Sequence, residues 1–396
     1  MEHITMSNRP PVREILESEI RKAGGDENKG KNRAGQIYEE LLDTKEGTKD
    51  PTVRTDQVDL QEAWHAWFPY GDYRKWDART IAEATYKSGF SYLFDKLVSE
   101  VMIAKYNYGL GNVFNLVQQV NSTHETEDIV GVTAMEGLIE TKEGEPVALT
   151  TFKEKRAQIA NRTYERSVEL HRNMVIYDHL NQIIPIAEAI GEKTGNWLHK
   201  FIIQKATSQA CTATGEAANK SLIYGGTSRT MYANDHSSWD SYANDNLITR
   251  VVSTQAMDEM WTLLYLMRDN VGDYINPGTD LKLLCHPTRW KKWERYFSGQ
   301  YQGDSGNRAP NVYSGAFEII PTPYVDGAQY FYLGAFAKQT VWQWVQKTAV
   351  TRLGDQTQKA FDTGIVRQIK IGLTGGCGTT DYKFVVQSDG TVDADE

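Results

Sequence analysis

Apolar residues recur every three or four positions over about 178–210, which places them along one face of a helix. This is the longest helical pattern in the chain. Pro185 fits such a helix only within its first turn. Gly191 and Gly195 lower the helical propensity of its middle. The pattern therefore predicts one long helix with a weak centre.

Three other segments have helical patterns, and the C-terminal part alternates as strands do. Helices are predicted over about 79–105, 247–268 and 288–297. The expected strands are 281–287, 316–320, 329–335, 340–346, 364–371 and 381–387. Because helices and strands do not alternate regularly along the chain, this order predicts an α+β fold rather than a doubly wound sheet.

The first sixty residues are polar and rich in turn-forming residues. Two short helical patterns, 12–22 and 33–43, interrupt them, and each is too brief to bury a core by itself. Such a segment needs another surface to lie on, so we expect an extended arm. An aromatic run follows that could anchor the arm; it contains Trp64, Trp67, Phe68, Tyr70, Tyr73 and Trp76.

Residues 124–172 are divided by charge. Seven acids and one base lie between His124 and Glu145, whereas six bases and three acids lie between Pro146 and Arg172. A turn-like sequence, TKEGEP, separates the halves. In a long hairpin, an acidic outgoing strand would pair with a basic returning strand, and each charge pair would contribute about 0.2–1 kcal/mol. Neither half has a strong apolar face, so we expect the hairpin to project; the alternative is an irregular surface loop.

The stretch YANDHSSWDSYANDN, residues 232–246, gathers carboxylates, amides, serines and one imidazole. Asp235, His236 and Asp240 could form a metal site or the acid/base centre of a hydrolase. None of the eight histidines belongs to an HxH or HExxH motif, and none lies near a pair of cysteines. The sequence specifies no partners for such a site, so we predict no metal and no cofactor.

The same stretch can instead begin a helix. Asn244, Asp245 and Asn246 directly precede Leu247, the first residue of a strongly apolar helical pattern. Their oxygens would accept hydrogen bonds from the free amide groups of the first turn, and an acid suits the positive end of the helix dipole. We therefore expect this cluster to be a helix cap.

Two further motifs could carry chemistry. GLTGGCGTT, residues 372–380, looks like a phosphate-binding loop, but it lacks the GxxxxGK[ST] spacing and lies between strands, so we expect a turn. TRWKKWERYF, residues 288–297, interleaves bases and aromatics as nucleic-acid-binding segments do. At helical spacing its aromatics share one face and its bases another, so an amphipathic surface helix is preferred. No catalytic residue is predicted.

Composition excludes several classes of protein. The chain has 396 residues, 40% of them hydrophobic, and its net charge of −9 gives no global attraction to nucleic acid or anionic membranes. Three cysteines without CxxC spacing fit a reducing compartment better than a disulfide framework. The N-terminus lacks a signal-peptide profile, and no apolar run approaches the ~20 residues of a membrane helix. We expect a soluble intracellular product without membrane contact.

The remaining distinctive feature is the length of chain devoted to projections. An arm and a hairpin that cannot bury themselves are expected to hold other copies of the same chain. The residues predicted to make contacts between subunits are Trp64, Trp67, Phe68, Lys142, Glu143, Glu145, Lys153, Lys155 and Arg156.

Six segments follow one another in a characteristic order. They are FSYLFDKLVSEVMIAKYNYGLGNVFNLVQQV (90–120), KEGEPVALTTFKEKRAQIANRTYERSVELHRNMVIYDHLNQI (142–183), MYANDHSSW (231–239), LKLLCHPTRW (281–290), FEIIPTPYVDGAQYFYLGAF (317–336) and GIVRQIKIGLTGGCGTTDYKFVV (364–386). The series resembles the major capsid proteins of tailed bacteriophages, especially the Mu-type major head subunit. It covers roughly residues 60–390, and the order of the segments carries the resemblance rather than any one motif.

The resemblance implies the phage major-capsid fold, an α+β fold shared with encapsulins. Its parts would be an N-terminal arm, an extended E-loop hairpin, a peripheral domain with a long spine helix, and an apical domain. The implied boundaries are 1–78 for the arm, 79–122 for the first part of the peripheral domain, 123–168 for the E-loop, 169–230 for the peripheral domain with the spine helix, 231–337 for the apical domain, 338–372 for the long strand of the peripheral domain, and 373–396 for the closing apical strand and C-terminal tail.

The resemblance also implies a function. Copies would self-assemble as hexamers and pentamers into an icosahedral shell around double-stranded DNA. Portal, scaffold and cement proteins are further expected partners, and contact with packaged DNA would be non-specific. The protein would be made in the host cytoplasm and reside in the virion. The alternatives are an encapsulin-like shell enclosing protein cargo, another virion component such as a tail or portal protein, and a hydrolase or metal enzyme using Asp235 and His236.

Overall fold

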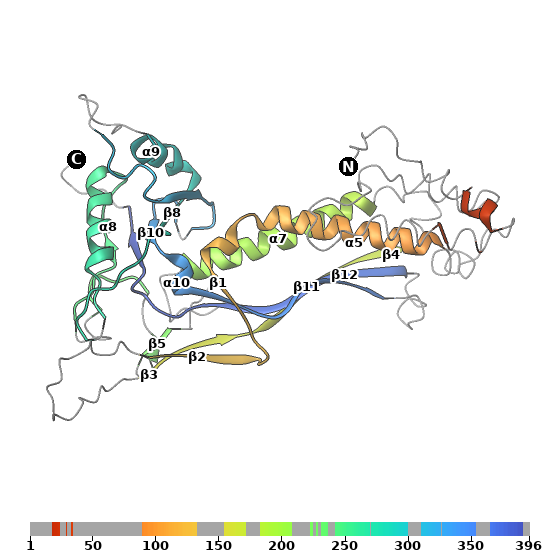
Figure 1. The fold of residues 1–396 in the computed structure, drawn as a ribbon, viewed down its shortest axis with the longest axis horizontal. Helices are drawn as coiled ribbons and strands as arrows, with labels where there is room; N and C mark the ends of the chain where they lie inside the picture. Colours follow the sequence, from red (N-terminus) through yellow and green to blue (C-terminus); the bar gives the residue numbers. More distant parts are fainter. Residues whose placement is uncertain are drawn as a thin grey trace, which may run out of the picture. The chain divides into compact units, whose positions relative to one another are not determined.

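The computed structural model combines helices and sheets without regular alternation, which confirms the α+β prediction (Figure 1). It describes residues 18–23, 29, 33–34, 89–132, 154–171, 183–207, 222–224, 227–228, 231–236, 242–269, 271–299, 310–325, 327–353 and 365–390. The chain divides into two compact units. The first holds the described residues up to Gly111 with Tyr164–Trp197 and Thr348–Leu373, and the second holds the others.

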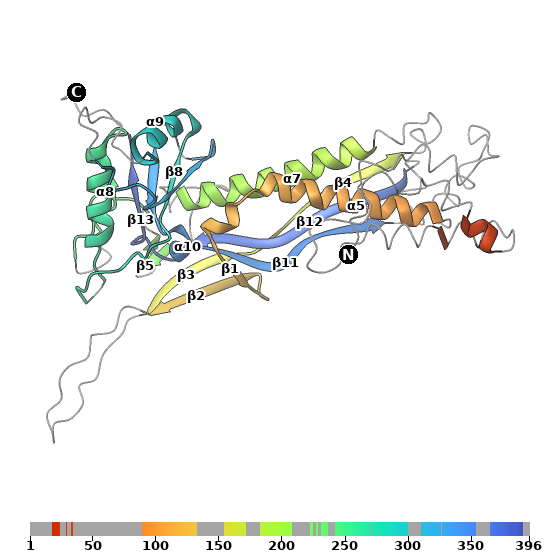
Figure 2. The same ribbon diagram turned by 45° about the horizontal axis from the view of Figure 1, so that its top comes forward.

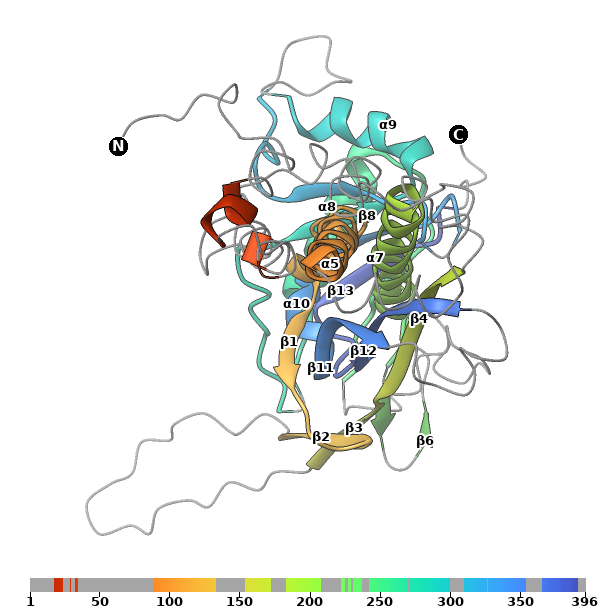
Figure 3. The same ribbon diagram turned by 90° about the vertical axis from the view of Figure 1, so that its right-hand side faces the viewer.

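Helix α5, Gly89–Leu110, and helix α7, Ile183–Thr207, lie side by side (Figure 3). A Cβ atom at Gly191 would overlap the carbonyl oxygen of Met102, and one at Gly195 would likewise overlap the backbone of α5. The glycines therefore let the two helix backbones touch, which any side chain would prevent. The sequence interpretation, a weak helix centre, missed this packing role.

The long helix otherwise follows its prediction closely. Pro185 is the third residue of α7 and so lies in the first turn, as its missing N–H requires. The helix expected at 79–105 corresponds to α5, which extends to Leu110. Residues 79–88 of that expected helix lie outside the described residues.

A four-stranded sheet has the strand order β1-β11-β12-β4. Its strands are β1, Gln118–Asn121; β11, Thr340–Leu353; β12, Ile365–Thr379; and β4, Arg162–His171. Strand β1 runs parallel to the start of β11, with Gln118 opposite Val341. The alternation expected at 340–346 and 364–371 therefore belongs to two strands that are each about twice as long as predicted from it.

The turn predicted at 372–380 is wrong, because β12 continues through almost all of this segment. Gly375 and Gly376 lie where another part of the backbone passes closely. A Cβ atom at Gly375 would overlap the carbonyl oxygen of Gln343, and one at Gly376 would overlap that of Ala160. Glycine here permits the close approach of another strand rather than chain reversal.

The second sheet has the order β7-β13-β10-β8-β9. Its short strands are β7, Leu247–Ile248; β13, Val385–Ser388; β10, Phe331–Gly334; β8, Lys282–Cys285; and β9, Glu318–Pro321. Strand β10 is antiparallel to β8 and β13, whereas the outer strands run parallel to their neighbours. The three inner strands are buried throughout, which confirms the apolar strand expected at 281–287.

Helices α8, Thr254–Leu266, and α9, Pro287–Phe297, cover one face of this five-stranded sheet. The ring centroids of Trp293 on α9 and Phe331 on β10 lie 4.8 Å apart. The shared core includes Met257, Met260, Leu264, Trp293, Phe297, Phe331, Leu333 and Val386. The helix predicted at 288–297 is thus confirmed, and one apolar cluster joins both helices to the sheet.

The opposite face of the same sheet packs against the C-terminal end of α7. The hydroxyl of Tyr332 donates to the carbonyl oxygen of Thr207 at 3.1 Å, and that of Tyr232 donates to Ala206 at 2.8 Å. The two phenol rings lie 5.4 Å apart. Both hydroxyls therefore satisfy their hydrogen bonds while fully buried.

The third sheet has the order β2-β3-β5-β6. Its strands are β2, Thr126–Val132; β3, Glu154–Ala160; β5, Leu222–Tyr224; and β6, Thr227–Ser228. Strands β2 and β3 are antiparallel neighbours, as the predicted hairpin requires (Figure 2). The returning strand also pairs with β5, so the hairpin does not project freely along that edge, because both edges of β3 are hydrogen-bonded.

Two short helical turns, η3 at Val113–Leu116 and α10 at Phe336–Gln339, precede β1 and β11. None of the helices that the structure describes has the length and apolar content needed to cross a bilayer.

Candidate functional site

His236, the imidazole of the candidate metal or hydrolase site, is buried with only 1% of its surface exposed. Its Nε2 lies 2.9 Å from Oδ1 of Asn246, and its ring stacks on Tyr382 with centroids 3.9 Å apart. An amide oxygen can only accept, so Nε2 carries the proton of this bond. The nitrogen is therefore committed to a hydrogen bond inside the protein.

Asn246 uses all the hydrogen-bonding groups of its side chain. Its Oδ1 also accepts from the backbone N–H of Ala233 at 2.8 Å, and its Nδ2 donates to the carbonyl oxygens of Met231 at 2.9 Å and Tyr382 at 3.0 Å. Those two carbonyls fix the orientation of the amide, since only its NH₂ group can donate. One buried side chain thus joins three segments of backbone.

Asn244 makes a second junction beside the first. Its Nδ2 donates to the carbonyl oxygen of Arg268 at 2.9 Å and to the hydroxyl of Tyr382 at 3.1 Å, while its Oδ1 accepts from the N–H of Arg268 at 2.9 Å. These bonds attach the loop to the residues that follow α8. The two asparagines therefore stabilise the body of the second unit.

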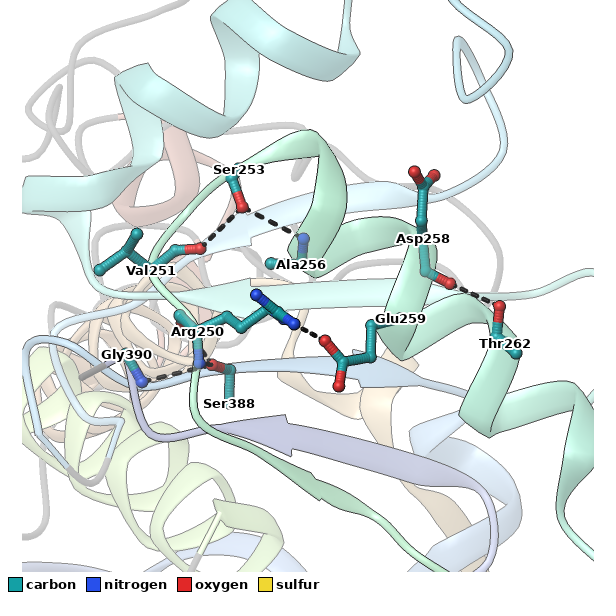
Figure 4. A network of polar contacts seen from close by, with 9 residues as sticks. All are labelled: Arg250, Val251, Ser253, Ala256, Asp258, Glu259, Thr262, Ser388 and Gly390. Atoms are coloured by element: carbon teal, nitrogen blue, oxygen red, sulfur yellow. Dashed lines mark hydrogen bonds and ion pairs between the residues drawn. The ribbon is translucent and has the colours of Figure 1, made fainter. Parts of the chain in front are cut away.

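The predicted helix cap is wrong. Leu247 lies in strand β7, and helix α8 begins seven residues later at Thr254. Ser253 caps that helix instead, because its Oγ accepts from the N–H of Ala256 at 3.1 Å (Figure 4). Because β7 pairs in parallel with β13, the chain stays extended after the loop. The side-chain amides of the loop asparagines therefore form hydrogen bonds inside the protein instead of capping a helix.

A polar network connects the start of α8 with the edge of the sheet (Figure 4). Ser388 Oγ donates to the carbonyl oxygen of Arg250 at 2.6 Å and accepts from the N–H of Gly390 at 3.3 Å. The guanidinium of Arg250 pairs with the carboxylate of Glu259 on α8. These contacts hold the linker between β7 and α8 in place.

The carboxylates of the loop do not form a reaction centre in the described residues. Asp245 Oδ1 accepts the N–H of Leu247 at 2.9 Å. Burial raises the pKa of the Asp245 carboxyl, and nearby Glu259 and Asp235 add to the rise against the Leu247 bond, which lowers it. Asp240 lies outside the described residues. Within the described part of the chain, no three His, Cys, Asp or Glu side chains form a group that could hold a metal.

Two of the three cysteines are described, and both are free and buried. Burial raises the pKa of the Cys285 and Cys377 thiols to about 12. Both thiols therefore stay protonated at neutral pH, which makes them poor nucleophiles. Cys211 lies outside the described residues.

Most residues predicted to contact other subunits also lie outside the described part. These are Trp64, Trp67, Phe68, Lys142, Glu143, Glu145 and Lys153. The structure places the backbone of Lys155 and Arg156 in β3, opposite Gly131 and Val130. The role of all nine residues in subunit contacts stays a prediction.

The described ladder of β2 and β3 places no acid directly opposite a base. Glu127 is opposite Ile159, and Asp128 is opposite Gln158. The expected direct pairing of opposite charges across the strands is therefore wrong for this part of the hairpin. The register of the two strands instead depends on backbone hydrogen bonds and on the buried end of the hairpin.

The end of the hairpin next to Asn161 is anchored by buried residues, whereas the rest of the hairpin sequence is polar. Asn161 is buried, and its Nδ2 donates to Ser122 Oγ at 3.0 Å and to the carbonyl oxygen of His124 at 2.7 Å. Its own N–H donates to the carbonyl oxygen of Glu125 at 2.7 Å. Ile159, the second-last residue of β3, is also buried. Thus the hairpin is fixed at one end by a small buried cluster.

Sequence reasoning missed Tyr382, which meets both asparagines and the histidine of the loop. It lies 136 residues beyond Asn246, so no local spacing could connect them. The repeated sequence Tyr-Ala-Asn-Asp correctly indicated a polar loop. No pattern in the sequence indicates that this loop is buried.

A sequence model of the family described as "Phage capsid protein" matches residues 156–388. The matched region begins in β3, includes α7, α8 and α9, and ends with the last residue of β13. A search of curated proteins finds no match to this chain.

Solved structures of similar fold were also found. One from Mycobacterium phage Cain has a TM-score of 0.45 at 12% identity and covers 72% of this chain and 91% of that chain. The capsid structure of cyanophage P-SCSP1u has a TM-score of 0.44 at 9% identity and covers 69% and 86%. A virus-like particle from Pyrococcus furiosus has a TM-score of 0.38 at 10% identity and covers 74% and 97%.

Proposed function

The chain belongs to the phage capsid protein family, and from this premise we propose that its copies assemble as hexamers and pentamers into an icosahedral shell enclosing double-stranded DNA. As a capsid protein it is a structural component of the virion and not an enzyme. The family match over 156–388 is the observation that carries the proposal, because it includes the five-stranded sheet, the long helix and most of the long strands.

The hairpin supplies one contact between copies in this proposal. Its arms carry opposite charge in sequence, and the described strands place no such pair directly across the ladder. We assign Lys142, Glu143, Glu145, Lys153, Lys155 and Arg156 to this contact.

The N-terminal segment supplies a second contact, with Trp64, Trp67 and Phe68 as its apolar anchors. These three side chains would be buried only when copies assemble, so the segment would take up its final conformation during assembly. Exposed charge pairs are individually weak and screened by salt, so they orient a neighbour without trapping a misplaced one. Weak contacts of this kind suit a shell that must correct errors while it closes.

Further partners follow from the same proposal. Portal, scaffold and cement proteins would meet the shell, and packaged DNA would touch it without sequence preference. The subunit would be made in the host cytoplasm before it enters the virion.

Electron microscopy of the chain expressed alone tests the shell. We expect closed particles whose averaged images show fivefold and sixfold groups of subunits. A chain that stays monomeric at micromolar concentration, or forms only open aggregates, would contradict self-assembly.

The enclosed cargo is tested on particles purified from phage-producing cells and identified by the peptides of this chain. DNA that survives nuclease until the particles are opened supports the proposal. Particles filled with one enzyme and free of DNA would favour the nanocompartment alternative.

A further inference from the structure

The outward side of α9 is strongly basic. The helix contains four bases and one acid, and the acid, Glu294, pairs with Lys291 at 3.0 Å. Three bases at three-residue spacing remain, and we call them the α9 face: Arg289, Lys292 and Arg295. Within the described residues, none of these three has a carboxylate in ion-pair distance. The α9 face therefore carries charge that the described fold does not neutralise.

The outward side of α8 has the opposite character. This helix contains two acids and no base. We call its exposed or half-exposed outer row the α8 face: Gln255, Asp258, Trp261, Thr262 and Tyr265. The rings of Trp261 and Tyr265 stack with centroids 5.4 Å apart.

The two acids of α8 have different roles. Glu259 is paired with Arg250, whereas Asp258 points to another side of the helix (Figure 4). The carboxylate of Asp258 accepts a hydrogen bond from the hydroxyl of Tyr313. The α8 face thus presents one carboxylate beside two stacked aromatic rings.

Both helices cover the same face of one sheet and share its apolar core, and both belong to the second compact unit. A contact between unlike faces of identical bodies is heterologous, and its repetition forms a ring when the rotation between copies closes and an open filament when it does not. A ring of subunits is what the proposed capsomer requires.

We propose that the α8 face of one copy binds the α9 face of the next copy around such a ring. This inference rests on the proposed function. Carboxylate and aromatic rings match guanidinium and ammonium groups, through charge-assisted hydrogen bonds and cation–π contacts. The exposed apolar edge of Tyr265 would lie against the aliphatic stems of the bases.

Nucleic acid is the competing occupant of the α9 face. Single strands bind to basic surfaces whose aromatic rings are open for stacking. On α9, Trp293 and Phe297 are buried, the ammonium of Lys291 lies 3.9 Å above the ring of Trp290, and that of Lys292 lies 5.9 Å from the ring of the half-buried Tyr296. The helix therefore offers charge without an open stacking platform, whereas α8 offers a complementary face on every copy.

A charge exchange tests the contact. The first variant reverses the α9 face with Arg289→Glu, Lys292→Glu and Arg295→Glu, and the second makes the α8 face basic with Gln255→Lys, Asp258→Lys and Thr262→Lys. Like charges brought together cost several kcal/mol, so each variant should lower the shell yield by at least about tenfold. The combined variant should recover shells to within about threefold of the original chain, since 0.6 kcal/mol changes an equilibrium about threefold.

A matched control exchanges the ion pair inside α9, with Lys291→Glu and Glu294→Lys, which keeps the net charge of the helix. It should assemble like the original chain. Circular dichroism and thermal unfolding of each unassembled variant show whether it folds. A variant that does not fold is replaced by its neutral counterpart, Arg289→Gln, Lys292→Gln and Arg295→Gln, which should lower the yield less than reversal would.

Failure to recover shells in the combined variant, with both parents folded, would overturn the contact. The contact would also be overturned by an α9 variant that assembles normally and loses only its binding of duplex DNA in a gel-shift assay. In either case shells of the original chain would leave the proposed function intact, whereas absence of shells from the original chain would overturn the function itself.

Discussion

Two polar stretches of this chain lead to opposite structures. The loop at 231–246 is rich in asparagine and aspartate, yet Asn244, Asn246 and His236 are buried, and the two asparagine amides bond to backbone groups. The hairpin formed by β2 and β3 is also polar in sequence, and the end next to Asn161 holds the buried Ile159 and Asn161. Polar residues thus build an interior joint in the loop and a two-stranded backbone ladder in the hairpin.

The difference lies in the side chains and in their partners. Asparagine can donate and accept within a small volume, so it can satisfy two strands of backbone at once. Lysine, arginine and glutamate lose more rotamer freedom and more hydration when buried, so they stay outside unless paired. We expect substitutions in the loop to change folding and substitutions in the hairpin to change assembly.

The largest effect on folding is expected from Asn246→Ala. The change leaves the carbonyls of Met231 and Tyr382 and the donors of Ala233 and His236 without their partner. Each buried unsatisfied group costs about 1–3 kcal/mol, and partial relaxation makes a total of about 3–5 kcal/mol reasonable. Urea unfolding of the unassembled subunit measures it.

The exposed Asn276 provides the control, because its Oδ1 accepts only the nearby N–H of Gly278 at 2.9 Å. Asn276→Ala should lower the unfolding free energy by less than about 1 kcal/mol. Equal losses in the two variants would show that the buried amide has no special role.

Gly376→Ala should have the next largest effect, because it strikes the buried end of the hairpin at Ile159 and Asn161. The added methyl group would overlap the carbonyl oxygen of Ala160 and the side chain of Asn161. Overpacking of this kind costs about 1–3 kcal/mol. The expected result is a lower midpoint of thermal unfolding.

Gly315 has open space around it but a positive φ of 77°. Gly315→Ala therefore isolates backbone strain from overlap, at about 1 kcal/mol. A Gly376→Ala variant no less stable than the Gly315→Ala variant would contradict the close packing at the hairpin base.

Asp245→Asn should give a smaller change of opposite sign. Because burial raises the pKa of this carboxyl in the folded state, its favourable contribution is present in acid and is lost as the pH rises from about 4 through the raised pKa. Asparagine keeps an oxygen for the N–H of Leu247 and removes the buried charge. The variant should be more stable at pH 7, with a gain that shrinks toward pH 4.

Calorimetry across this pH range measures the gain. The matched change Asp273→Asn, at an exposed carboxylate, controls for the loss of one surface charge. A less stable Asp245→Asn variant at pH 7 would show that the charge is favourable where it lies.

Much of the fold could be predicted from apolar spacing. The spacing gave α7, α9 and the inner strand β8, because one buried face leaves a periodic record. The glycines at 372–380 were wrongly interpreted as a turn, because glycine serves both the close approach of two backbones and chain reversal. The start of α8 was misplaced by seven residues, because asparagines that serve a distant Tyr382 look like local caps.

The site was less predictable for a physical reason. Burial of the loop depends on partners such as Arg268 and Tyr382 that are far away in sequence. The hairpin could be predicted from its charge reversal, but its register could not, because backbone bonds and the buried Asn161 determine it.

The smallest effect on folding and the largest on assembly are expected from reversing the basic arm, with Lys153→Glu, Lys155→Glu and Arg156→Glu. The backbone bonds of the ladder do not depend on these charges, so the unfolding free energy should change by less than about 0.5 kcal/mol. The contact with a neighbour should be lost, because its orientation depends on complementary charge.

The shell yield of this variant, counted by electron microscopy per folded subunit, tests most directly that the hairpin serves assembly. We predict folded subunits and few closed particles. A normal yield of shells from the reversed hairpin would contradict the account.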